Sequence, residues 1–232
     1  PTPDPLAYLP PPVMPDAGKM TTVSLGGGGT QYTLTPGTYS NLPTFTSGDV
    51  VILEQASANR NGGIFYINGG GFKSTGATIT MDPTTSGGVM LYNEPASTAL
   101  SEKIQITGNG AGTVNLGPLT SGPYAGMMLW QDRNSPVNAL VEGNGNFSVL
   151  GTFYLPGALL NINGNGLTTT GFTDAAGNIV AAGSSPAIGS QYVTQDLSLG
   201  GNGNINIKYS GPNMARTRII ALAVSYTHLT LP

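Results

Sequence analysis

The chain has 232 residues, of which 39% are hydrophobic and only 8% are charged, so it can fill a core but has little charged surface. Its eight Lys and Arg residues are too few for a phosphate-binding patch, and no apolar run reaches the roughly 20 residues that span a bilayer. These features argue against nucleic acid as a partner and against a membrane span. The absence of Cys excludes thiol chemistry and Cys-ligated metals.

The chain divides into three parts by composition. Prolines crowd the first 15 residues, and we interpret residues 1–29 as a Pro/Gly-rich arm or cap. Residues 30–223 are expected to form one β domain. Residues 224–232 resemble sequencing-adapter read-through of the kind seen at the ends of metagenomic genes, and we interpret them as a non-native tail. This tail holds His228, the one His of the chain, so the domain is expected to contain no His-based catalysis and no His-ligated metal.

A Gly-Asn-Gly motif occurs four times and is flanked each time by alternating apolar residues. The central residues of the four copies are Asn109, Asn144, Asn165 and Asn202. Gly permits tight corners, and Asn side chains can link one turn to the next by hydrogen bonds. The motif therefore predicts a ladder of equivalent turns, one per structural repeat. We interpret Asn-Gly-Gly-Gly at residues 68–71 as a degenerate copy.

A second class of strand repeats between these turns, and each strand begins with a small residue. The five segments are residues 63–67, 88–92, 126–130, 151–155 and 190–194. Aligned on the small residue, their third and fifth positions are mostly large and apolar, so we expect these two columns to fill the interior.

Together the repeats predict an all-β fold, a single-stranded right-handed parallel β-helix (a solenoid) with loop insertions. Stacked coils would pair their backbone groups and bury a shared core that no single coil can bury alone. The alternative is a Gly-rich β-sandwich whose turns are Asn-Gly hairpins.

The fourth position of the aligned strands should face outward and would form an apolar stripe. Its members are Tyr66, Leu91, Leu129, Tyr154 and Val193. Aromatic rings stack on sugar faces or anchor protein partners, so the stripe is a candidate ligand-binding surface. Alternatively, loops or the Pro-rich arm cover it.

Acidic residues recur at one expected corner of the repeat, at Glu94, Asp132 and Asp196. On adjacent coils Glu94 and Asp132 would lie about 5 Å apart, which suits retaining glycoside chemistry or a calcium site. Arg133 could then neutralise an acidic sugar. The alternative is that these acids only end strands, with Asp132 and Arg133 in a turn. We assign no catalytic residue and no cofactor, with calcium as the one candidate.

Four segments resemble the Gly/Asn-rich C-terminal region of bacterial TadG-like proteins, which are associated with Tad-type (Flp) pilus assembly. They are residues 4–10, 68–72, 122–133 and 151–156, and the element ending in Gln-Asp-Arg at 131–133 is the most specific of them. The resemblance implies a cell-envelope or extracellular location and a link to surface attachment. It brings no established catalytic residues.

These observations predict a structural or adhesive cell-surface or secreted protein, possible partners being a polysaccharide or a cell-surface protein. Two alternatives remain, a polysaccharide-binding module and a polysaccharide lyase or hydrolase. The oligomeric state is open, because unpaired edge strands could support self-association.

Overall fold

The computed structural model describes residues 3–58, 61–109 and 112–217. The expected tail at 224–232, with His228, lies outside the described residues. The fold is all-β, as expected, and is built from two large sheets and one small hairpin. Within the described residues no helix is long and apolar enough to cross a membrane.

The seven-stranded sheet is parallel except at its first pair, where β1 and β2 are antiparallel. Its strands, in spatial order, are β1 (Met20–Ser24), β2 (Thr30–Leu34), β5 (Val50–Leu53), β8 (Thr78–Met81), β11 (Thr113–Leu116), β14 (Asn146–Val149) and β18 (Ala187–Ile188).

The ten-stranded sheet is parallel throughout. Its strands, in spatial order, are β3 (Gly37–Tyr39), β6 (Ile64–Asn68), β9 (Met90–Glu94), β12 (Met127–Gln131), β15 (Thr152–Gly164), β13 (Ala139–Gly143), β10 (Ile104–Thr107), β7 (Phe72–Thr75) and β4 (Thr44–Thr46), and β19 (Gln191–Gly200) also pairs with β15. The remaining elements are the hairpin of β16 (Phe172–Thr173) and β17 (Ile179–Val180) and three 3-10 helices, η1 (Ala56–Ala58), η2 (Leu100–Glu102) and η3 (Gly211–Asn213).

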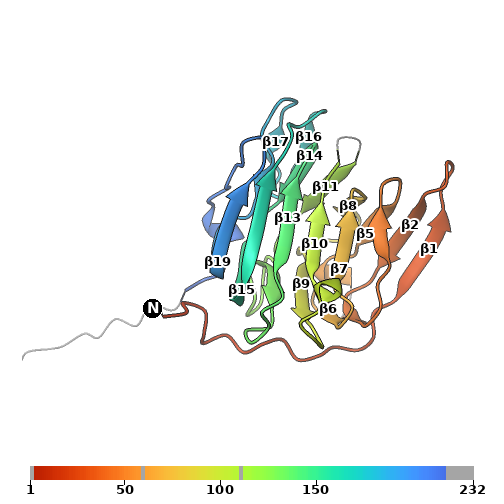
Figure 1. The fold of residues 1–232 in the computed structure, drawn as a ribbon. Helices are drawn as coiled ribbons and strands as arrows, with labels where there is room; N and C mark the ends of the chain where they lie inside the picture. Colours follow the sequence, from red (N-terminus) through yellow and green to blue (C-terminus); the bar gives the residue numbers. More distant parts are fainter. Residues whose placement is uncertain (1–2, 59–60, 110–111, 218–232) are drawn as a thin grey trace, which may run out of the picture.

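Most strands pair in parallel with the strand that comes three later in the chain. β3, β6, β9 and β12 form one row, β4, β7, β10 and β13 a second, and β2, β5, β8, β11 and β14 a third. β15 is long enough to pair with β12 through its first residues and with β13 through its last, so two rows join into one curled sheet. Figure 1 shows the strands side by side from β1 to β19. This parallel pairing contradicts the alternative of Asn-Gly hairpins.

The Gly-Asn-Gly turns all leave the same row of strands, because they follow β10, β13, β15 and β19. Gly143 pairs with Gly164, which places two copies of the motif at one corner. The interpretation of residues 68–71 as a degenerate copy is wrong, since they connect β6 to β7 at a different corner. There Gly71, at φ 68°, lies so close to the next turn that an added Cβ would fall 2.4 Å from the carbonyl oxygen of Lys103.

The expected interior columns are right in β6 and β15 and wrong by one residue in β9. In β12 they are right for Met128 but wrong for Trp130. The structure pairs Phe65 with Leu91, Leu91 with Leu129, and Leu129 with Phe153. β9 and β12 each carry one residue more after their leading Gly than β6 and β15 do, and a bulge between Met127 and Leu129 absorbs it in β12. A shift of one residue exchanges the faces of a strand.

Two apolar clusters result from this register. The main core lies inside the curled sheet and includes Phe65, Leu91, Leu129 and Phe153. The second cluster lies on the opposite face of β6, β9, β12 and β15. It consists of Leu6, Leu9, Tyr66, Met90, Tyr92, Leu119, Met127, Trp130, Tyr154 and Ala215.

The register makes Leu129 a stability determinant instead of a surface residue. Leu129 is 1% exposed in the main core. Truncation in Leu129→Ala should therefore lower the free energy of unfolding by about 2–5 kcal/mol in urea titrations. Leu197→Ala on β19 is the matched control, because Leu197 is 43% exposed and its truncation should cost less than about 1 kcal/mol. Equal losses in the two variants would contradict the register.

Candidate functional site

A row of aromatic rings runs across β6, β9, β12 and β15 on their outward face. The register pairs Tyr66 with Tyr92, Tyr92 with Trp130, and Trp130 with Tyr154. Their ring centroids are separated by 4.7, 6.0 and 5.0 Å along the row. The expected outward stripe is therefore only partly right. Tyr66 and Tyr154 belong to it with Val193, whereas Leu91 and Leu129 face the main core.

The N-terminal arm covers this aromatic row. Leu6 and Leu9 of the arm pack in the same cluster as the rings, and Tyr124 adds an edge contact to Trp130 at 5.6 Å. Tyr66 and Tyr154 are consequently 4% and 0% exposed. The sequence left open whether the stripe is an exposed ligand-binding surface or is covered by loops or the arm, and the structure shows that the arm covers it.

Arg133 holds the arm in place. Its guanidinium donates hydrogen bonds to the carbonyl oxygens of Leu6 at 3.0 Å and Leu9 at 2.7 Å. It also donates to the Tyr154 hydroxyl, lies 3.7 Å from the Asp4 carboxylate, and stacks 5.1 Å from the Trp130 ring centroid. The Tyr154 hydroxyl in turn donates to Asp4. Arg133, expected to face an acidic sugar, thus binds the chain's own backbone.

Gln131 and Asp132, which precede this arginine, have structural contacts of their own. The Gln131 side chain is fully buried; it accepts a hydrogen bond from the Asn93 amide at 3.2 Å and donates to the carbonyl of Val137. The Asp132 carboxylate accepts a hydrogen bond from the Asn134 backbone at 2.9 Å. Residues 131–133 therefore all have structural contacts: Gln131 pairs with a buried amide, Asp132 caps a turn and Arg133 binds the arm.

The structure brings together two of the three candidate acids. The Asp132 backbone N–H donates to the Asn93 carbonyl at 2.9 Å, so Asp132 lies next to Glu94 on the adjacent strand. Glu94 accepts a hydrogen bond from the Tyr66 hydroxyl at 2.6 Å. Asp196 is displaced, because it pairs with Leu159 beyond an irregularity in β15 and is exposed. Within the described residues no three His, Cys, Asp or Glu side chains are grouped to hold a metal ion.

The predicted asparagines lie at one corner and connect successive turns. The Asn109 amide donates to the Gly76 carbonyl at 2.8 Å. The Asn202 backbone N–H donates to the Asn165 side-chain oxygen at 3.3 Å. Asn144 occupies the same corner between β13 and β14. In both contacts, the hydrogen bond joins an Asn side chain to the backbone of a neighbouring turn.

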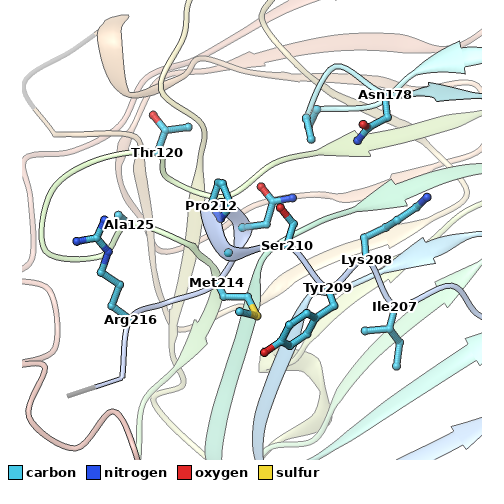
Figure 2. Close-up of a pocket in the computed structure, with 14 residues that line it drawn as sticks. Thr120, Ala125, Asn178, Ile207, Lys208, Tyr209, Ser210, Pro212, Met214 and Arg216 are labelled. Carbon is cyan, nitrogen blue, oxygen red and sulfur yellow. The ribbon is translucent and has the colours of Figure 1, made fainter. Parts of the chain in front are cut away.

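A cleft that the sequence did not indicate lies beside the segment 207–214. Its volume is about 1040 Å³, and its lining includes Thr120, Asn178, Lys208, Tyr209 and Arg216. Figure 2 shows Lys208 and Arg216 on opposite sides, with Tyr209 and Met214 between them. The region carries no Gly-Asn-Gly motif. The one signal in the sequence is that three of the chain's eight cations, Lys208, Arg216 and Arg218, lie close together in the chain.

No protein-family model, curated protein or solved structure matches this chain.

Loss of the hydrogen bonds from Arg133 to the Leu6 and Leu9 carbonyls, which we call the Arg133 clamp, should release the arm. Arg133→Gln removes charged hydrogen bonds to two carbonyls, so we expect a loss of about 2–3 kcal/mol in unfolding free energy and faster chymotrypsin cleavage after Tyr8. Lys103→Gln removes the same charge elsewhere and should change neither measurement. Unchanged cleavage in Arg133→Gln would show that the other contacts of the arm, its apolar packing and the hydrogen bonds of Tyr8 and Pro10, hold it without Arg133.

The buried tyrosines should make the fold sensitive to alkali. Burial raises the pKa of Tyr154 from 10.0 to about 12, assisted by its hydrogen bond to Asp4, and burial likewise raises the pKa of Tyr39 to about 12. The unfolded chain releases these protons near pH 10, so stability should be complete below pH 10 and fall as the pH rises toward 12. Urea titrations at increasing pH measure this loss. The unfolding free energy should fall less steeply with pH in Tyr154→Phe than in the unsubstituted protein. An equal slope would contradict the raised pKa of Tyr154.

Proposed function

We propose that this chain is a right-handed parallel β-helix that acts as a structural and adhesive component of the bacterial cell surface or of a secreted assembly. The pairing of strands three apart in the chain supports the β-helix, because three strands and three corners would then make one coil. Crossovers between parallel strands are almost always right-handed, which supports the hand.

The observation that carries the structural role is the closure of the outward aromatic face. Tyr66, Trp130 and Tyr154 offer the rings that a sugar ligand would need, yet the arm buries them. Arg133, the cation beside them, binds two arm carbonyls. These side chains therefore contribute to the stability of the domain, as expected of a part that must persist outside the cell.

An enzymatic role has less support. Glu94 is hydrogen-bonded to Tyr66, Asp132 to the turn that follows it, and Asp196 lies apart from both. Hydrolysis would need two carboxylates facing a substrate.

An association with a Tad-type pilus system is part of the proposal. It rests on the resemblance of the quoted segments to TadG-like proteins. Two of them, residues 4–10 and 122–133, contact each other through the hydrogen bonds of Arg133 to Leu6 and Leu9. This contact supports a shared structural role for the two segments, which is to hold the arm on the domain.

The dimensions favour a compact surface unit over a long spacer. Seven strands at a spacing of about 4.8 Å stack to roughly 29 Å. The described part is therefore better suited to adhesion, which depends on exposed side chains, than to a role as a long spacer.

Adhesion and turnover can be measured on the same protein. Beads coated with the full chain should be retained on surfaces of bacterial cells or bacterial exopolysaccharide more strongly than albumin-coated beads. A panel of polysaccharides incubated with the chain should release no new sugar ends. Absence of retention on every surface would refute the adhesive role. Turnover that disappears in Asp132→Asn would replace it with an enzymatic one.

A further inference from the structure

We propose that the cleft beside residues 207–216 binds an acidic polysaccharide, a hydroxyl-rich chain that carries carboxylates at intervals. This site borders the covered aromatic cluster, because its lining residues Met214 and Arg216 flank Ala215 of that cluster, but it does not depend on the structural role proposed above. Its volume of about 1040 Å³ lies at the upper end of the range for ligand sites, so it offers room for more than one sugar ring.

The charged side chains that line the cleft are both positive. Lys208 and Arg216 line it, and no carboxylate does among the residues that the structure describes. The one ion pair within the described ranges joins Arg133 to Asp4, so neither Lys208 nor Arg216 is neutralised there. An anionic ligand would meet two cations with no acidic competitor.

The acid of the adjoining turn, Asp174, does not offer its carboxylate to the cleft. The Asp174 carboxylate is 4% exposed. It accepts hydrogen bonds from the backbone of Ala176 and from both the backbone and the side chain of Asn178. Asp174 therefore stabilises the turn whose residues Ala176 and Asn178 line the cleft, and its carboxylate oxygens face that turn.

The uncharged part of the lining suits sugars. Tyr209 is 82% exposed, and Met214 lies beside its ring (Figure 2). Aromatic rings stack on sugar faces, and the Ser210 hydroxyl and Asn213 amide can bond to sugar hydroxyls. Because Figure 2 places the two cations on opposite sides of this surface, an extended chain could cross it and place a carboxylate at each end.

The charge balance favours a glycan over a nucleic acid. A nucleic acid strand carries a phosphate about every 3.4 Å and is held by many cations. The cleft supplies two, on a chain with a net charge of -3. An acidic polysaccharide can bind with two charge contacts, because its rings also stack on Tyr209 and its hydroxyls bond to the uncharged polar lining.

Native affinity electrophoresis of the full chain tests the proposal, with gels that contain polygalacturonate, neutral dextran or DNA. We expect retardation by polygalacturonate and none by dextran. The double variant Lys208→Gln/Arg216→Gln should bind polygalacturonate about tenfold more weakly, since each exposed charge pair contributes up to about 1 kcal/mol. Tyr209→Ala should weaken binding without any change of charge.

A control variant separates the cleft from general charge effects. Lys19→Gln/Lys73→Gln removes two cations outside the cleft and should retain full binding. Equal weakening in the two double variants, or no retardation by polygalacturonate, would overturn the proposal. Equal retardation by dextran would overturn the acidic selectivity, and stronger retardation by DNA would overturn the choice of a glycan. Circular dichroism confirms that each variant is folded.

Discussion

Parallel backbone hydrogen bonding between strands three apart in the chain is the constraint on which the rest of the structure depends. It sets Phe65 beside Leu91 and Leu91 beside Leu129, and so decides which side chains fill the curled sheet. It also aligns Tyr66, Tyr92, Trp130 and Tyr154 on the opposite face. Because side chains alternate between the two faces of a strand, the same register determines the members of both apolar clusters.

The second cluster needs a cover, and the arm supplies it. Leu6 and Leu9 bring apolar surface, while Arg133 satisfies their carbonyl oxygens and stacks on Trp130. A buried carbonyl without a partner is costly, so one arginine lets the extended arm lie over an apolar face. The same contacts remove the aromatic rings from solvent, which is why residues that look like a ligand site serve stability.

Binding chemistry is then left to a surface beside the arm, where the Tyr8 hydroxyl of the arm donates to the Arg216 backbone carbonyl at the edge of the cleft. The cleft beside residues 207–216 combines an exposed ring, Tyr209, with two cations and no lining carboxylate within the described part of the chain. A protein that binds a polymer in this cleft uses one set of side chains for stability and another for binding. Its covered face would maintain the fold, and its cleft would contact the polymer.

The sequence by itself determined the all-β fold and the shared corner of the Gly-Asn-Gly turns, because both follow from local periodicity and from the conformations open to glycine. Only the tertiary structure decided the faces of Leu91, Leu129 and Trp130. A period of two does not reveal a one-residue bulge, which is a property of hydrogen bonding between strands. The Arg133 clamp and the cleft likewise arise from segments distant in the chain, and no local pattern brings such segments together.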